Sequence, residues 1–280
     1  MCRFIAYLGR PIPINNVIVK PKYSLIQQSR HAKESYVTVN GDGFGVAWYQ
    51  PEVHHDPAVF TSILPAWNDV NLQNIADQIA SPCVLGHVRS AEEGGISQQN
   101  CHPFRHKKWL LMHNGRVIGF NQIKLELYKL MAPEYFESIK GQTDSEALFA
   151  LWLTCYQRQS QNAQGMMDAW REVFSHVECL QDAKGIKGRT FINTLLSNGQ
   201  CLLASRYSRI DEPLSLYYSA GNGFVLKEDE SFHMQPTKGT VQAVLIASER
   251  STAHRDEWQE VPKAHFVWVE PRHAPAFFAI

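Results

Sequence analysis

Residues 2–8 read Cys-Arg-Phe-Ile-Ala-Tyr-Leu, and this aromatic and branched run ends at the turn signal Gly9-Arg10-Pro11. Such a composition predicts a β-strand that enters a turn. Removal of Met1 would leave the Cys2 thiol beside its own α-amine, whose ordinary pKa of about 7.7 to 8.0 lets it accept a proton near neutral pH. A free cysteine is more often a small buried hydrophobe. The stretch therefore predicts a strand that carries a candidate nucleophile at its start.

Other parts of the chain alternate between strand and helix signals. Thr143-Asp144-Ser145-Glu146 has the capping-box pattern and predicts the start of one helix, while the helical spacing of apolar residues over 166–180 predicts a second. Strands at both ends and helices in the middle favour one α+β domain of antiparallel sheets over alternating βαβ units. The remaining predicted strands cover residues 44–49, 83–88, 109–113, 190–196, 201–205, 241–247 and 265–269.

Charge and cysteine usage exclude several classes of protein. The 280 residues carry 27 basic and 27 acidic side chains without a long run of one sign, which gives no reason to expect nucleic acid or an anionic membrane as a partner. No apolar run approaches membrane-spanning length, and the six cysteines are too sparse for a disulfide scaffold. We therefore expect a soluble, cytoplasmic protein that binds a small molecule.

Three further positions are candidates for a binding site, and each has an ordinary structural alternative. Arg89 follows a predicted strand, where it is either solvated or a planar fork for a carboxylate. Asn114-Gly115 is a typical hairpin signal, like Asn198-Gly199 later in the chain, but its amide and backbone N–H groups could also stabilise an oxyanion. Asp144 suits a helix start, and it could equally bind an ammonium group.

Metal and phosphate sites are not predicted. The clusters His54-His55-Asp56 and Cys101-His102 lack the ligand spacing of a helical histidine pair or a zinc knuckle. The glycine-rich residues 41–45 precede a predicted strand, whereas phosphate loops lie between a strand and a helix. We expect neither a metal nor a cofactor.

In chain order, several motifs together resemble the class II glutamine amidotransferases, the cysteine branch of the N-terminal nucleophile hydrolases. The likeness is greatest to stand-alone members such as the YafJ-like proteins and the γ-glutamyl hydrolases of ergothioneine biosynthesis and glutathione degradation. The motifs that carry it are MCRFIAYLG (1–9), NGDGFGVAWY (40–49), GHVRSA (86–91), MHNG (112–115), QTDSEALF (142–149), LIASERST (245–252) and WQEVPKAHFVWV (258–269).

The resemblance implies a four-layer αββα sandwich over residues 1–280 as a single glutamine amidotransferase type 2 domain. It also implies a role for each candidate. Cys2 would be the nucleophile once Met1 is removed, Arg89 and Asp144 would hold the α-carboxylate and α-amino groups of the substrate, and Asn114 with Gly115 would form the oxyanion hole. The implied reaction is cleavage of the γ-amide of glutamine or a γ-glutamyl compound through a thioester on Cys2, with release of ammonia or an amine.

Larger members of the family carry a synthase domain that consumes the ammonia, and no segment of this chain resembles one. Either ammonia passes to a synthase in trans, or hydrolysis of a γ-glutamyl amide is itself the purpose, which we favour slightly. Two alternatives stay open. One is an N-terminal cysteine amidase for another acyl group. The other is a non-catalytic γ-glutamyl-binding module, which a retained Met1 would favour because the α-amine would then be part of a peptide bond.

Overall fold

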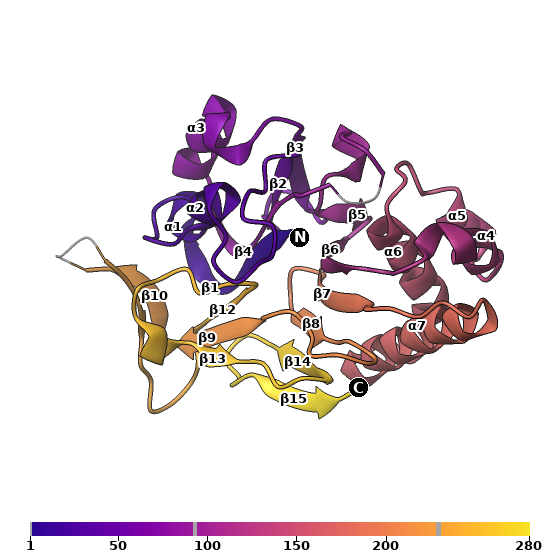
Figure 1. Cartoon of the computed structure of the whole chain (residues 1–280). Helices are drawn as coiled ribbons and strands as arrows, with labels where there is room; N and C mark the ends of the chain where they lie inside the picture. The colour runs from indigo at the N-terminus through magenta and orange to yellow at the C-terminus, as the bar shows by residue number, and fades with distance from the viewer. Residues whose placement is uncertain (1, 92–93, 228–230) are drawn as a thin grey trace.

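The computed structural model describes residues 2–91, 94–227 and 231–280, and Met1 lies outside them. Its architecture is two antiparallel sheets that lie face to face and are flanked by helices on both outer sides (Figure 1). This is the four-layer α+β fold that the resemblance implies.

The first sheet has seven strands, and every neighbouring pair is antiparallel. In spatial order its strands are β13 (Gln259–Glu260), β9 (Tyr217–Gly221), β12 (Ala243–Ala247), β1 (Arg3–Pro13), β4 (Ala80–Val88), β2 (Phe44–Tyr49) and β3 (Ala58–Ser62). The strand predicted from residues 2–8 therefore lies in the middle of the sheet, with partners on both edges.

The second sheet has six strands, again all antiparallel. In spatial order they are β15 (Ala276–Ala279), β14 (His265–Val269), β8 (Leu202–Arg206), β7 (Phe191–Ser197), β6 (Trp109–Arg116) and β5 (Phe104–His106). A separate hairpin is formed by β10 (Gly223–Leu226) and β11 (Phe232–Gln235).

Helices cover the outer face of each sheet (Figure 1). On the first sheet lie α1 (Ile14–Ile18), α2 (Leu25–Arg30) and α3 (Val70–Gln78), and on the side of the second lie α4 (Phe120–Lys129), α5 (Pro133–Phe136), α6 (Asp144–Tyr156) and α7 (Ala163–Ala183). Short 3-10 turns span Ala66–Asn68, Gln98–Asn100 and Arg255–Glu257. None of the helices in the described ranges is both long and apolar enough to cross a membrane.

The alternation of side chains along β1 explains why this segment sits at the centre. Phe4 and Ala6 point into the apolar layer between the two sheets, while Ile5 and Tyr7 point to the layer under α1 and α2. Both faces are buried over residues 3–8, and residues 4–8 are apolar, as expected for a strand with a layer on each side. By the same alternation, Cys2 comes before Phe4 on the inner side.

The predicted strands and the two predicted helices are all present, with shifts at their ends. Strand β2 has the predicted bounds, while α7 extends beyond the predicted 166–180 at both ends. The short or edge elements β3, β5, β9, β10, β11, β13 and β15 and the helices α1 to α5 were not predicted from the sequence. Strand β3, for example, is only half-buried along its whole length and shows no alternation between buried and exposed positions.

The hairpin interpretation of Asn114-Gly115 is wrong. Both residues lie inside β6 and pair with Asn193 and Ile192 of β7, and the pairing continues to the next residue. The same signal at Asn198-Gly199 does mark a turn, because residues 198–201 connect β7 to β8 and Gly199 has a φ of 85°. The connection between β7 and β8 has four residues, whereas the dipeptide signal predicts a two-residue turn.

The layer between the sheets should dominate the stability of this fold. Leu85 of β4 is fully buried there, so Leu85→Ala should lower the free energy of unfolding by about 2 to 5 kcal/mol, since it removes apolar contacts and leaves a cavity. Urea unfolding measures the change. The matched control is Leu125→Ala on α4, where the side chain is 63% exposed and the loss should stay within about 0.5 kcal/mol. Equal losses in the two variants would contradict the assigned core.

Candidate active site

A small cavity of about 30 Å³ lies where five segments meet, and it brings together most of the predicted site residues. Cys2 precedes β1, Arg89 follows β4, Gly115 belongs to β6, and Asp144 is the first residue of α6. Strands β1 and β4 belong to the first sheet and β6 belongs to the second, so the site depends on the way the two sheets face each other. The other residues of its wall are Ser90, His102, His113, Arg116, Thr143 and Ser145.

The Cys2 thiol lies 3.6 Å from the Ser90 carbonyl oxygen, to which it donates a hydrogen bond. Burial raises the pKa of this thiol, while that hydrogen bond and the charges of Arg89 and Arg3 act in the opposite direction. The net shift is upward, so the thiol is protonated at neutral pH. A nucleophilic attack by Cys2 would therefore need a base to take its proton.

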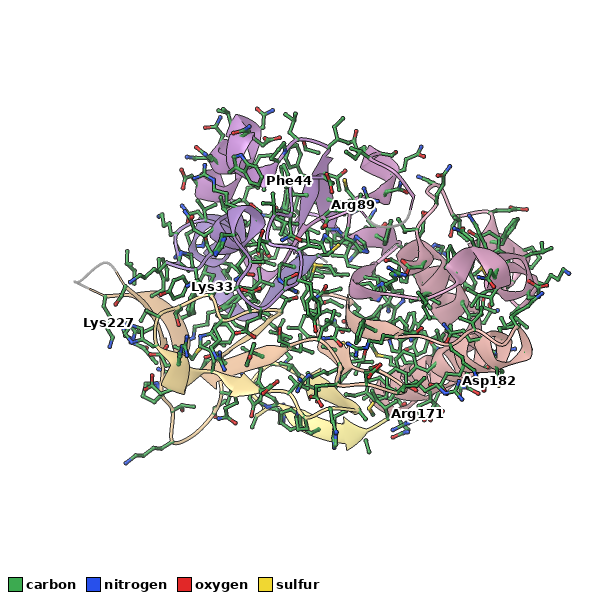
Figure 2. The ribbon with its side chains drawn as sticks, in the orientation of Figure 1. Lys33, Phe44, Arg89, Arg171, Asp182 and Lys227 are labelled. Atoms are coloured by element: carbon green, nitrogen blue, oxygen red, sulfur yellow. The ribbon has the colours of Figure 1, made fainter. Side chains whose placement is uncertain are left out.

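Arg89 is a buried cation with a fixed backbone (Figure 2). Its N–H donates to the Gly43 carbonyl at 2.8 Å, and its own carbonyl accepts from the Asp42 N–H at 3.0 Å. The guanidinium donates through Nη1 to the Gly95 carbonyl at 2.8 Å. The strand end thus holds a positive group in the cavity wall.

Asp144 supplies a buried carboxylate at the start of α6. Its Oδ2 accepts from the Val117 N–H at 2.8 Å, and its Oδ1 accepts from the Ser145 hydroxyl at 3.1 Å. Thr143 caps the helix by accepting from the Glu146 N–H at 3.2 Å. The reciprocal half of the predicted capping box is not made, because the Glu146 carboxylate accepts from the N–H groups of residues 140 and 141 instead.

Asn114 is fully buried below the cavity, against the backbone of Cys2. The amide orientation that satisfies both neighbours donates from Nδ2 to the Cys2 carbonyl at 2.7 Å and accepts from Arg3 Nη1 at 3.0 Å. Gly115 reaches the cavity wall itself. A side chain there would be impossible, since a Cβ would lie 2.0 Å from the Phe191 carbonyl oxygen.

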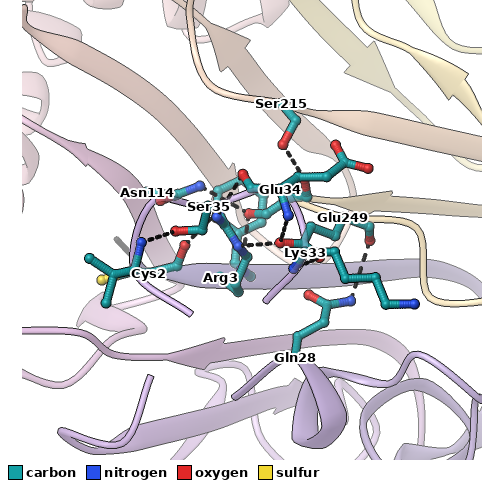
Figure 3. A network of polar contacts seen from close by, with 12 residues as sticks. Cys2, Arg3, Gln28, Lys33, Glu34, Ser35, Asn114, Ser215 and Glu249 are labelled. Carbon is teal, nitrogen blue, oxygen red and sulfur yellow. Dashed lines mark hydrogen bonds and ion pairs between the residues drawn. The ribbon is translucent and has the colours of Figure 1, made fainter. Parts of the chain in front are cut away.

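A buried guanidinium directly after Cys2 holds this arrangement together (Figure 3). Arg3 donates through Nη1 to the Cys2 carbonyl and through Nη2 to the Glu34 carbonyl, each at 3.0 Å. Its Nε lies 2.8 Å from the Glu249 carboxylate, which also accepts from the N–H groups of Lys33 and Glu34. The guanidinium of Arg3 therefore connects the first strand, the loop after α2 and the loop after β12.

His102 and His113 line the cavity and His87 stacks on His102, and burial lowers the pKa of each of the three. The pKa of His87 falls to about 3, and its Nε2 lies 3.2 Å from the His113 carbonyl oxygen. His102 stacks on His87 with ring centroids 4.1 Å apart. His113 lies 2.8 Å from the Ser145 hydroxyl through Nδ1. All three imidazoles are consequently neutral at physiological pH.

Two groups of side chains elsewhere in the described ranges could supply three ligand atoms to a metal ion. They are Cys155 with Glu172 and His176, and His233 with His254 and Glu257. Glu172 is already paired with Arg158 at 2.5 Å, and His233 with Glu257 at 2.7 Å. Neither group shares a residue with the Cys2 cavity.

The sequence analysis did not identify Arg3, His87, His102, His113 or Ser145 as parts of the site. A signal for Arg3 was present, because a charged residue inside an otherwise apolar central strand must find a buried partner. No comparable signal exists for the histidines, whose proximity arises only when the ends of β4 and β6 meet.

Two facing antiparallel sheets thus bring the Cys2 thiol, a buried guanidinium and a buried carboxylate to one cavity. Residues 14–273 match the family model of the class-II glutamine amidotransferases. The chain belongs to this family of enzymes.

Two curated proteins are similar to this chain over different shares of its length. The chain is 32% identical to "Probable glutamine amidotransferase DUG3" of Saccharomyces cerevisiae, over 94% of this chain and 80% of that protein. It is 31% identical to the γ-glutamyl-hercynylcysteine sulfoxide hydrolase of Mycobacterium tuberculosis strain H37Rv, over 42% of this chain and 50% of the hydrolase. The second match covers only half of that enzyme's length.

A solved structure covers the whole chain. The glutamine aminotransferase class-II domain protein from Silicibacter pomeroyi superposes with a TM-score of 0.68 at 26% identity and covers 100% of both chains. The glutamine phosphoribosylpyrophosphate amidotransferase of Bacillus subtilis superposes with a TM-score of 0.61 at 16% identity, over 99% of this chain and 49% of that one, and shows a shared fold.

The neutral histidines predict a loss of stability in acid. Because the pKa of His87 is lowered from 6.5 to about 3, the unfolded chain binds a proton below pH 6.5 that the folded chain does not bind. This contribution to stability is complete above pH 6.5, and about 2 kcal/mol of it should be lost between pH 7.5 and pH 5. In urea unfolding, His87→Gln should reduce the fall in the free energy of unfolding between pH 7.5 and pH 5 by about 2 kcal/mol. His273→Gln, at an exposed position, should leave that fall unchanged. Identical pH dependence in both variants would refute the assignment.

The ion pair of Arg3 predicts a large cost for removing its partner. Glu249→Gln leaves the buried guanidinium without a countercharge, so the free energy of unfolding should fall by about 3 to 5 kcal/mol. Urea unfolding at pH 7 measures it. The control is Glu212→Gln, where the carboxylate that pairs with Arg206 is 65% exposed and the loss should be below about 1 kcal/mol. A loss as small as the control's would show that Arg3 does not depend on Glu249.

Proposed function

We propose that this chain hydrolyses the γ-amide bond of glutamine or of a γ-glutamyl compound, with Cys2 as the nucleophile and residues 1–280 as one catalytic domain. The observation that carries the proposal is the shared cavity of the Cys2 thiol, the Arg89 guanidinium and the Asp144 carboxylate. Membership of the class-II glutamine amidotransferases supports it, as do the names of the yeast and mycobacterial relatives.

The two buried charges are suited to one end of a free amino acid. Arg89 can pair with an α-carboxylate through two parallel hydrogen bonds, and Asp144 can accept hydrogen bonds from an α-ammonium group. A γ-glutamyl group presents both of these and carries its reactive carbonyl at the far end of the side chain. Substrates that lack a free α-amino acid end cannot form these charged hydrogen bonds with Arg89 and Asp144, so we expect them to bind less tightly.

The reaction begins with transfer of the thiol proton to the α-amine of Cys2, which is free once Met1 has been removed. The thiolate then forms a bond with the γ-carbonyl carbon, and the carbonyl electrons move onto oxygen. The Gly115 N–H stabilises this charge together with the second Nδ2 hydrogen of Asn114, whose first Nδ2 hydrogen is donated to the Cys2 carbonyl. Collapse of this intermediate breaks the carbon–nitrogen bond, and the amine leaves with the transferred proton. Water then cleaves the thioester and releases glutamate.

The raised pKa of the Cys2 thiol supports a role for a neighbouring base. None of the three surrounding histidines is suited to this task, because burial lowers their pKa values and His113 is already hydrogen-bonded to the Ser145 hydroxyl and near the Phe191 carbonyl. The α-amine, with an ordinary pKa of about 7.7 to 8.0, is matched to a proton transfer near neutral pH.

The preferred substrate is a γ-glutamyl amide whose hydrolysis is itself the purpose, in agreement with the name of the mycobacterial relative. A panel of glutamine, γ-glutamyl peptides, penicillin V and glycine conjugates tests this choice. Turnover of γ-glutamyl peptides above that of glutamine is expected. Release of ammonia from glutamine alone would favour a synthase in trans, and turnover of penicillin V or glycine conjugates would favour an amidase for another acyl group.

The nucleophile is tested by Cys2→Ala, which should abolish turnover because no other group can form the thioester. Cys179→Ala removes an exposed thiol and is the matched control, with unchanged turnover expected. Mass spectrometry after treatment with 6-diazo-5-oxo-norleucine should find the label on Cys2 alone and should show that Met1 is absent. Normal turnover by Cys2→Ala would contradict the proposal. A retained Met1 with no labelling would favour the non-catalytic γ-glutamyl-binding module.

The substrate-binding role of Arg89 is tested by Arg89→Lys, because a lysine ammonium cannot reproduce the planar guanidinium of arginine. We expect kcat/KM to fall at least about tenfold, the cost of a lost charged hydrogen bond. Arg189→Lys, on a pair with Asp211 whose arginine is 63% exposed, is the control and should leave kcat/KM unchanged. An unchanged value in Arg89→Lys would remove Arg89 from the substrate site.

A further inference from the structure

A second cavity, of about 280 Å³, lies beside α2 and has no residue in common with the Cys2 cavity. Its walls come from two stretches that are far apart in sequence, residues 22–34 around α2 and residues 249–255 after β12. Its size suits a small metabolite rather than a peptide or a drug-sized ligand, whose pockets begin at about 300 Å³.

The walls carry more positive than negative charge. Four cationic side chains contribute to them, Lys22, Lys33, Arg250 and Arg255, against the two carboxylates of Glu34 and Glu249. Both carboxylates already have partners inside the protein. Glu249 pairs with Arg3 at 2.8 Å, and Glu34 pairs with Arg250 at 3.3 Å and accepts from the Tyr217 hydroxyl at 2.7 Å.

Three of the cations are left without an acidic partner. Lys22, Lys33 and Arg255 form no ion pair with any residue in the described ranges. The two lysines lie over the same ring, with the Lys33 Nζ 3.8 Å and the Lys22 Nζ 5.8 Å from the centroid of Tyr23. Both ammonium groups therefore lie close to one ring of the cavity wall, where an anion would neutralise their charge.

The cavity wall also contains buried polar atoms without hydrogen-bond partners. Gln28 is 3% exposed, and its Nε2 donates to the Tyr23 carbonyl at 2.8 Å, but its Oε1 has no partner within the described residues. The Nε of Arg250 is likewise buried and unpartnered there. An unsatisfied acceptor and an unsatisfied donor in two residues of one wall cost free energy, which rotation of these side chains toward a bound polar molecule would recover.

We propose that this cavity is a second binding site, for a small organic anion that carries at least two negative charges. Lys22, Lys33 and Arg255 pair with its phosphate or carboxylate groups, and an N–H or O–H of the ligand donates to Gln28. The shared chemistry is that of a multiply charged oxyanion, whose source is either a phosphate monoester or a polycarboxylate. The site does not depend on the proposed function of Cys2, because binding is measured without turnover.

The test is calorimetric titration of the full chain with glycerol 3-phosphate and with citrate, at fixed ionic strength. Saturable one-to-one binding of at least one probe is expected. The double variant Lys22→Ala/Arg255→Ala should weaken it about a hundredfold, or about tenfold for each lost charged contact. Both side chains are exposed, and circular dichroism checks that the variant is folded.

The matched control is Lys129→Ala/Lys187→Ala, which removes the same charge from exposed positions near the α4 and α7 end of the molecule, away from α2 in Figure 1. Unchanged affinity in this control supports a defined site, and equal weakening in both double variants would overturn the proposal because it would reflect net charge alone. Failure of both probes to saturate below about 10 mM would also overturn it. The probe that binds identifies the source of the anion as phosphate or carboxylate.

Discussion

The buried ion pair between Arg3 and Glu249 is the interaction on which the rest of the site depends. The guanidinium of Arg3 donates hydrogen bonds to the Cys2 carbonyl, to the Asn114 side-chain oxygen and to a carbonyl in the loop after α2. A charge this deeply buried is stable only when an opposite charge and hydrogen bonds replace its lost hydration. Any shift of the loops around Glu34 and Glu249 would therefore move the backbone of Cys2, so the position of the thiol is set by contacts on the outer side of the first sheet.

The two sheets contribute different halves of the site. The first sheet supplies Cys2 and Arg89 from the ends of neighbouring antiparallel strands, β1 and β4. The second supplies Gly115, and α6, which packs on its outer face, supplies Asp144. Because the apolar layer between the sheets holds them in register, side chains more than a hundred residues apart share one cavity.

Local patterns in the sequence predicted much of this fold. The strand at residues 2–8, strand β2 and the start of α6 at Asp144 follow from composition, alternation and a capping signal, all of which act over a few residues. The family resemblance added the four-layer architecture. Short edge strands such as β13 and β15 carry too little pattern to be found this way, since their pairing partners stabilise them.

The two Asn-Gly dipeptides show where local reasoning stops. At 198–199 the chain turns, and at 114–115 it continues as a strand, although the dipeptide is the same. The difference lies in β7, which pairs with residues 114 and 115 and comes close enough to exclude any side chain at Gly115. The roles of Arg3 and of the three histidines were missed for the same reason, because their partners are far away in the sequence.

The raised pKa of Cys2 also bears on how this protein meets oxidants. Peroxide and other oxidants attack thiolates, and the cysteines that sense them are accessible and have lowered pKa values. Cys2 is half-buried, protonated at rest and hydrogen-bonded to a carbonyl oxygen, which is the opposite environment. This environment makes the Cys2 sulfur a poorer target for oxidation to sulfenic acid than an exposed thiolate.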